Sequence, residues 1–217
     1  WICKGTCIPS KICYNVENKG RRVSMNRFRK VYLEISNICN LHCEFCPGTS
    51  RKPKAMTQAE LEILLPKLRP WSDFLYFHLM GEPLLHPDID KFFNIAGDLG
   101  FKVIITTNGT LLDELAPLVE NNPSLFKVSI SLHSYEANEL GNFDDYLNSC
   151  FGFCESAANA GIISVMRLWN LGGEDSMNQR IIEKMHAFFD LDGTVLDTVG
   201  SIAHYGNRIY FGADPSF

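Results

Sequence analysis

The sequence lacks any apolar run of the ~18 residues that a membrane-spanning helix needs. It also lacks a basic patch with interleaved aromatic residues, since the basic segment 19–30 is short and the net charge of the 217-residue chain is −5. We therefore expect neither a membrane nor a nucleic acid as a partner. Eight cysteines without a recognised secretory leader indicate a reducing compartment, so we expect a cytoplasmic protein.

No convincing pair of acid and base side chains stands out, but three cysteines do. Cys39, Cys43 and Cys46 are spaced C-x3-C-x2-C, with an aromatic residue just before the last cysteine. Three thiolates on one short loop can hold three irons of a 4Fe–4S cube and leave the fourth iron open to a ligand that is not protein. Most clusters take four cysteines, and the next one along the chain is Cys150. The missing fourth ligand favours a vacant site over an electron-transfer ferredoxin.

Zinc is the main alternative for this loop. Structural zinc takes four nitrogen or sulfur ligands, usually in paired steps, and His42 lies between two of the cysteines, where it would strain a tetrahedron. A disulfide is disfavoured because three clustered cysteines cannot all pair. Cys150 and Cys154, four apart on an expected helix, are either ligands of an auxiliary cluster or buried apolar fillers, and we favour the second. Cys3, Cys7 and Cys13 are interpreted as incidental.

Apolar runs alternate with amphipathic stretches, which indicates βα units and a parallel sheet. Strands are expected at 31–36, 74–80, 103–107, 127–132, 163–168 and 208–211, and helices from a capping box at Thr57 and at about 88–99, 111–120, 144–160 and 178–189. Such a chain forms an open doubly wound sheet or a barrel. The cysteine loop and the other conspicuous residues follow strand ends, where both folds place their chemistry.

These motifs together resemble the radical S-adenosylmethionine (radical SAM) superfamily over about residues 30–170. The resemblance implies an α/β fold, a partial (β/α)6 barrel open on one side. It also implies a 4Fe–4S cluster held by Cys39, Cys43 and Cys46, whose open iron chelates S-adenosylmethionine (SAM). The run Met80-Gly81-Glu82-Pro83 resembles the family's Gly-Gly-Glu-Pro motif, with methionine in place of the first glycine.

The resemblance also implies which residues contact SAM. The main chain at Phe45 corresponds to the position near the adenine, and the region of Gly81 and Glu82 to the one that binds the amino group, which needs acceptors. Polar groups at later strand ends complete the expected set: Asn108, Ser131 and Arg167. Arg167 offers a planar fork to the SAM carboxylate, with an ion pair at the barrel rim as the alternative, and Asn108 is alternatively a turn residue. His78 and His86 are interpreted as packing or loop residues.

The implied chemistry is that of the cofactors. A reduced cluster passes one electron to SAM, and the resulting 5′-deoxyadenosyl radical abstracts a hydrogen atom from a substrate. A one-electron donor such as a flavodoxin or ferredoxin is therefore expected, and the substrate is unidentified, with a peptide as one candidate. The alternatives are an activating enzyme that makes a glycyl radical on a protein partner, and a non-catalytic module that binds zinc or an iron–sulfur cluster.

The two ends of the chain are interpreted separately. Met25 is taken as the true start, with residues 1–24 a tail or translated upstream sequence, and residues 25–217 as one radical SAM core domain that is incomplete at its C-terminal end. The segment 190–194 resembles the first motif of haloacid-dehalogenase-type phosphatases. Only 23 residues follow it, and the stretch before it has a helical pattern, so we interpret it as a chance match.

Overall fold

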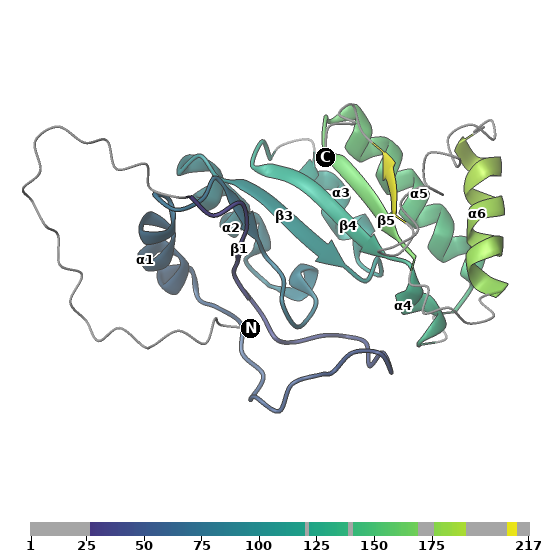
Figure 1. Ribbon diagram of the computed structural model, residues 1–217, viewed down its shortest axis with the longest axis horizontal. Coiled ribbons are helices and arrows are strands. Elements are labelled where there is room, and N and C mark those ends of the chain that lie inside the picture. Colours follow the sequence, from purple (N-terminus) through teal and green to yellow (C-terminus); the bar gives the residue numbers. More distant parts are fainter. Residues whose placement is uncertain (1–26, 120–121, 139–140, 169–175, 190–207, 212–217) are drawn as a thin grey trace, which may run out of the picture.

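The computed structural model describes residues 27–119, 122–138, 141–168, 176–189 and 208–211. Its strands form one sheet in which the spatial order follows the chain order (Figure 1). The strands are β1 (Val31–Tyr32), β2 (Phe74–Tyr76), β3 (Lys102–Thr107), β4 (Leu125–Ser131), β5 (Ile163–Arg167) and β6 (Arg208–Phe211). The first five pair in parallel, which confirms the expected α/β class and its βα units.

Helices follow the strands nearly where the periodicity placed them. They are α1 (Gln58–Leu68), α2 (Ile89–Asp98), α3 (Leu112–Val119), α5 (Phe143–Asn159) and α6 (Ser176–Phe189). The expected capping box begins α1: Thr57 Oγ1 accepts the Glu60 N–H, and the Glu60 carboxylate accepts the Thr57 N–H at 2.8 Å. Two short elements were not expected, the 3₁₀ helix η1 (Pro83–Leu85) and helix α4 (His133–Glu136).

The sheet has two chemically different faces because side chains alternate along each strand. Ile105, Ile130 and Met166 are fully buried in the hydrophobic core. Helices α2, α3 and α5 lie behind the sheet in Figure 1 and close this core. Thr106 and Ser129 pair with each other across β3 and β4 and, being one residue out of step with the core positions, point to the opposite face.

The two edge strands of the sheet differ from the expectation: β1 is shorter than predicted, and β6 runs in the opposite direction. The first strand is short because its continuation pairs elsewhere: Ile35 O accepts the Met56 N–H at 2.7 Å, and Ser36 bridges Ala55 in antiparallel fashion. The sixth strand has the expected bounds but runs antiparallel to β5. It therefore starts beside the end of β5 and adds no sixth parallel βα repeat to the sheet.

The cysteine pair on α5 lies in the core. Cys150 and Cys154 are at most 1% exposed. Burial raises the pKa of Cys154 to about 12 and that of Cys150 further, so both thiols are neutral. Gly109, which has a φ of +82°, packs so closely on α5 that an added Cβ would lie 3.2 Å from the Cys150 sulfur. This burial supports the interpretation of the pair as buried fillers.

Several expectations lie outside the described residues. These are the tail 1–24 with Cys3, Cys7 and Cys13, and the phosphatase-like segment 190–194. Helix α6 does end at Phe189, which agrees with the helical pattern expected before that segment. In the part of the chain that the structure describes, no helix has both the length and the apolarity to cross a bilayer.

Replacing Cys150 by alanine should lower the free energy of unfolding by about 1 kcal/mol, because one buried atom is removed from a packed core. Chemical denaturation measures this loss. Iron bound after anaerobic reconstitution should not change in the Cys150→Ala/Cys154→Ala double variant. A fall in iron content without loss of fold would instead make the pair cluster ligands.

Candidate active site

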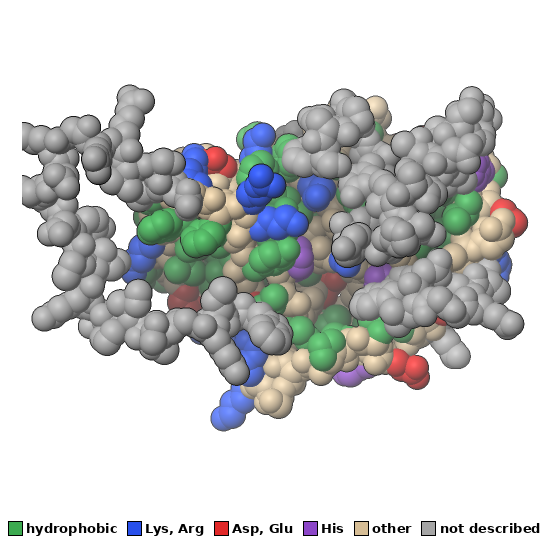
Figure 2. Space-filling view, viewed as in Figure 1, with side chains coloured by type: hydrophobic (Ala, Val, Ile, Leu, Met, Phe, Trp, Pro, Cys, Tyr) green, Lys and Arg blue, Asp and Glu red, His purple; other side chains and the backbone are tan. Residues whose placement is uncertain are grey.

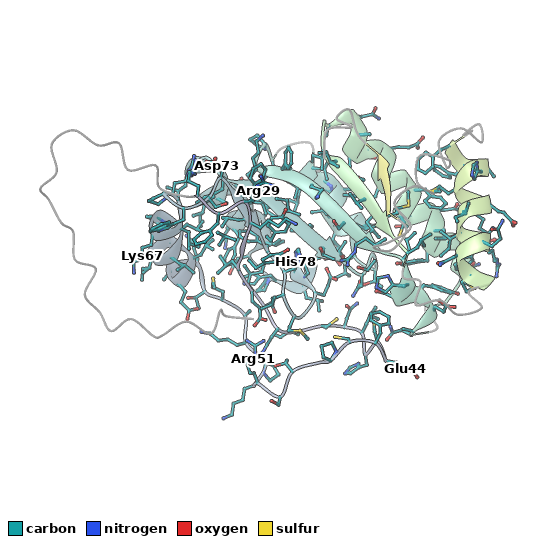
Figure 3. All side chains as sticks on the ribbon, in the orientation of Figure 1. Arg29, Glu44, Arg51, Lys67, Asp73 and His78 are labelled. Atoms are coloured by element: carbon teal, nitrogen blue, oxygen red, sulfur yellow. The ribbon has the colours of Figure 1, made fainter. Side chains whose placement is uncertain are left out.

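The cysteine loop lies beyond the carboxyl ends of the parallel strands, beside α4; Glu44, labelled in Figure 3, marks it. Cys39 and Cys46 are exposed and Cys43 is half-buried, and all three are free thiols. Phe45 stands edge-on to the imidazole of His133, with 4.7 Å between the ring centroids. The loop thus rests on the first residue of α4, which follows β4 directly.

Asn108, just after β3, fastens the start of the loop. Its Nδ2 donates to Asn40 Oδ1 at 2.8 Å, and its Oδ1 accepts the N–H and O–H of Thr110 at 3.0 and 2.7 Å. Asn40 Nδ2 in turn donates to Thr110 Oγ1 at 2.9 Å. The Asn108 side chain is buried and holds both its own turn and the residue next to Cys39.

Asn138, in the turn after α4, fastens the middle of the loop. Its Oδ1 accepts the His42 N–H at 2.9 Å, and its Nδ2 donates to Cys43 Sγ at 3.1 Å and to Ser134 O at 2.9 Å. The sequence analysis singled out neither Asn40 nor Asn138. The only signal for Asn40 is its place inside the cysteine motif, and Asn138 has none, because the contact spans 95 residues.

Gly81 lies directly against the segment that leads into the loop. Its φ is +81°, and an added Cβ would lie 2.6 Å from Ser36 O and 2.7 Å from Ile38 O. Glu82 N–H donates to Ile38 O at 2.7 Å. Only glycine combines the positive φ with this close approach, so the second glycine of the motif has a clear physical reason.

Glu82 is 2% exposed, and its carboxylate accepts two backbone N–H groups. Oε1 accepts from Leu84 at 3.1 Å, and Oε2 accepts from Asn108 at 2.8 Å. Burial raises the pKa of Glu82 to about 6, and these hydrogen bonds oppose that rise. The carboxylate therefore joins the turn after β2 to the turn after β3, whereas the sequence analysis expected it to be offered to an ammonium group.

Ser131 and Arg167 occupy paired positions at the ends of β4 and β5. Both belong to the sheet face opposite the helices, in step with Ser129 along the same register. The structure thus gathers all the expected site residues near one edge of the sheet: the cysteine loop with Phe45, then Gly81, Glu82, Asn108, Ser131 and Arg167.

The donor geometry bears on which group the loop holds. Among the described residues, no three His, Cys, Asp or Glu side chains are gathered to hold one metal ion. Tetrahedral zinc needs four donors around one point, whereas a 4Fe–4S cube distributes its thiolates over different irons.

Fold and site together define an α/β protein of the partial-barrel type with a cysteine loop at the carboxyl edge of its sheet. A family model of the Radical SAM superfamily matches residues 33–185. The chain belongs to this superfamily, which confirms the resemblance seen in the sequence.

Known proteins agree with this assignment. A probable GTP 3′,8-cyclase from Methanothermobacter marburgensis is 29% identical over 77% of this chain and 55% of its own. An AdoMet-dependent heme synthase from Methanosarcina barkeri is 28% identical over 54% of this chain and 35% of its own. The crystal structure of Streptococcus suis SuiB bound to S-adenosylmethionine shares the fold, with a TM-score of 0.57 and 20% identity over 77% of this chain and 39% of SuiB. The chain thus spans about half or less of the length of these proteins.

Gly81→Ala should lower the free energy of unfolding by about 2–4 kcal/mol, because the left-handed φ costs a β-carbon residue about 1–2 kcal/mol and the contact with two carbonyls adds overpacking. Gly141→Ala is the matched control, since Gly141 also has a positive φ, of 57°, but nothing lies within 4 Å of an added Cβ. Urea denaturation compares the two variants. Equal losses would show that the close approach at Gly81 contributes nothing.

Proposed function

We propose that this chain is the catalytic core of a radical SAM enzyme in which Cys39, Cys43 and Cys46 bind a 4Fe–4S cluster. One observation carries the proposal. Three free thiols stand on a single loop that two asparagines, Asn108 and Asn138, fasten to the carboxyl edge of a parallel sheet. That edge is where proteins with such sheets place their chemistry, and membership of the superfamily supports the same conclusion.

The sulfurs are already in surroundings that suit cluster ligands. Cys43 Sγ accepts the Asn138 amide N–H, and Cys39 Sγ accepts the Leu41 N–H at 3.4 Å. Hydrogen bonds to the sulfurs orient such ligands and tune the cluster. When bound, the cluster and SAM supply a 5′-deoxyadenosyl radical that takes a hydrogen atom from the substrate.

The expected SAM residues divide into two groups. Ser131 and Arg167 lie on the sheet face opposite the helices. There the hydroxyl and the guanidinium can bind the ribose or the carboxylate of SAM. Gly81 and Glu82 serve through their main chain, because the Glu82 carboxylate is already bound to backbone donors. Asn108 and Phe45 hold the cysteine loop in place. Asn108 hydrogen-bonds it to the end of β3, and Phe45 packs it against His133.

The partners follow from the same chemistry. The reaction needs a one-electron donor, a flavodoxin or a ferredoxin, and two of the cysteines are exposed on the loop where it would approach. A peptide is one candidate for the substrate, since SuiB, which shares the fold, has been crystallised with a precursor peptide. The two relatives compared above carry names that point to small molecules instead.

A non-catalytic metal module is the competing function, and an activating enzyme for a glycyl radical is a special case of the proposed one. Adding SAM to the reduced protein and recording its electron paramagnetic resonance spectrum tests the difference directly. A changed spectrum supports an enzyme, and an unchanged one supports a module.

Anaerobic reconstitution should load about four irons per chain. Replacing Cys39, Cys43 and Cys46 together by alanine should abolish both the iron and the formation of 5′-deoxyadenosine from SAM. The Cys150→Ala/Cys154→Ala variant is the matched control and should keep both. Iron analysis and chromatography of the nucleoside products give the readouts. A wild-type protein that takes up zinc rather than iron would contradict the proposal.

Asn138→Ala should lower the reduction potential of the cluster by about 40 mV, because the amide N–H stabilises the more negative, reduced state. The figure follows from a net hydrogen bond of ~1 kcal/mol and ~59 mV per tenfold change in a one-electron couple. Asn138→Asp should lower the potential further, since it keeps an acceptor for the His42 N–H but places negative charge beside the sulfur.

A spectroscopic redox titration measures these potentials without any substrate. Asn159→Ala, at the exposed end of α5, is the control and should not change the potential. If Asn138→Ala leaves the potential unchanged while the iron content stays at the wild-type level, the hydrogen bond does not tune the cluster.

A further inference from the structure

A hollow of about 160 Å³ lies on the sheet face opposite the helices, and strands β1 to β5 all contribute to it. Neutral hydrogen-bonding side chains are prominent in its lining: Tyr32, Tyr76, His78, Thr106 and Ser129. Figure 2 shows a histidine on this face with green side chains, the class that includes tyrosine, beside it, and Figure 3 labels His78 there. The chemistry of these five side chains indicates what the hollow can bind.

Three cations also line the hollow, but each of them already interacts with another group. Lys30 lies over the Tyr76 ring, with 5.7 Å between Nζ and the ring centroid. Lys127 and Arg167 take part in further interactions of their own. The neutral side chains are therefore the groups that remain to select a ligand.

Three aromatic rings in mutual contact form one wall of the hollow. The Tyr32 and Tyr76 rings have 4.8 Å between their centroids. The His78 ring stands edge-on to both, at 5.4 Å from Tyr32 and 5.8 Å from Tyr76. Tyr32 is 49% exposed, so part of this wall is open. Such a wall offers apolar contact to the carbon atoms of a ligand ring, while the tyrosine hydroxyls add hydrogen bonds.

His78 also carries a polar atom that the described structure leaves unsatisfied. Its Nε2 is 3.3 Å from Thr106 Oγ1, while its Nδ1 is buried with no hydrogen-bond partner. Burial first, and then the nearby cations led by Arg167, lower the pKa of His78 to about 4, so the ring is neutral at neutral pH. A buried nitrogen without a partner calls for an explanation, and a hydroxyl group bound beside it supplies one.

The five neutral side chains share one chemical property. A phenol, an aliphatic hydroxyl and a neutral imidazole can each donate one hydrogen bond and accept another. A carboxylate only accepts, and an ammonium group only donates. A ligand hydroxyl does both, so it can pair with every one of these side chains. Together with the aromatic wall, this property matches a ring that carries several hydroxyl groups.

The position of the hollow suits a substrate that lies next to SAM. Thr106 and Ser129 pair with each other on β3 and β4, and Ser131, proposed for SAM, lies two residues further along β4. Strands rise about 3.3 Å per residue, so roughly 7 Å separates the two levels. A ring held beside Ser129 is therefore adjacent to the SAM site without occupying it.

We propose that this hollow binds a hydroxylated ring of the substrate, a sugar or a cyclitol, with Tyr32, Tyr76, His78, Thr106 and Ser129 as its binding residues. The inference rests on the proposed function, because the ring belongs to the molecule that gives up the hydrogen atom. A volume of about 160 Å³ equals about five waters at ~30 Å³ each, which is the space of a single ring with its hydroxyls. Such a substrate is a hydroxylated small molecule rather than a peptide.

The test uses the full chain with its reconstituted cluster and saturating SAM. Titration calorimetry with methyl β-xylopyranoside and with myo-inositol is compared with tetrahydropyran, the same ring as the xyloside without hydroxyls. We expect at least one hydroxylated probe to bind, and to bind at least tenfold more tightly than tetrahydropyran. Thr106→Val, which keeps the shape and removes the hydroxyl, should weaken that probe about fivefold, as for loss of one net hydrogen bond. The tighter probe distinguishes a sugar from a cyclitol.

His78→Phe is the second variant, because it keeps a ring against both tyrosines and removes the unsatisfied nitrogen. It should fold like the wild type and bind the probe about fivefold more weakly. Thr49→Val is the matched control, since Thr49 is an exposed threonine outside the hollow, and it should bind like the wild type.

Four results would overturn the proposal. These are that no hydroxylated probe binds, that tetrahydropyran or a capped alanine dipeptide binds equally well, that Thr49→Val weakens binding as much as Thr106→Val, or that SAM displaces the probes. Formation of 5′-deoxyadenosine is measured on the same preparations. Its absence from a wild type that binds the probes would remove the proposed function and leave the hydroxyl-binding site standing.

Discussion

The site depends on the contact between the turn after β2 and the segment that leads into the cysteine loop. Gly81 lies close enough to the carbonyls of Ser36 and Ile38 to exclude a side chain, and Glu82 completes the contact with a backbone hydrogen bond and a buried carboxylate. Because that carboxylate also accepts the Asn108 N–H, three strand ends are held together. A buried acceptor that loses such donors costs about 1–3 kcal/mol or more, which strongly favours this one arrangement.

Rigidity at this edge has a chemical purpose in the proposed enzyme. A highly reactive radical needs its target held in place. Site residues keep their positions to within about 0.5 Å only when packing and hydrogen bonds fix the side chains around them. The amides of Asn40, Asn108 and Asn138 supply that support. They are neutral, so they add hydrogen bonds around the sulfurs without placing a further charge beside a cluster that must accept an electron.

The sequence predicted the repeating elements well because they depend on local patterns. The capping box at Thr57 and the helices after β2 to β5 are within a few residues of their expected bounds. The direction of β6 could not be predicted, since pairing direction depends on how the chain returns to the sheet rather than on the strand itself. Asn40 and Asn138 were missed because their contacts span 68–96 residues. The motif singled out Glu82, but burial, which the motif does not reveal, directs its carboxylate oxygens to the N–H groups of Leu84 and Asn108.

The alternation of side chains along each strand determines both the apolar core under the helices and the polar face opposite the helices. Placing Ile105 and Ile130 under the helices forces Thr106 and Ser129 to the other side, so the polarity of that side is set by the same register. A parallel sheet buried on both faces would carry nearly continuous apolar strands. The lysines, the arginine and the neutral histidine on this face therefore depart from what packing alone favours. Departures from local rules are expected where a protein binds a ligand, and here they extend along the sheet face from Lys127 to Arg167 at the carboxyl edge.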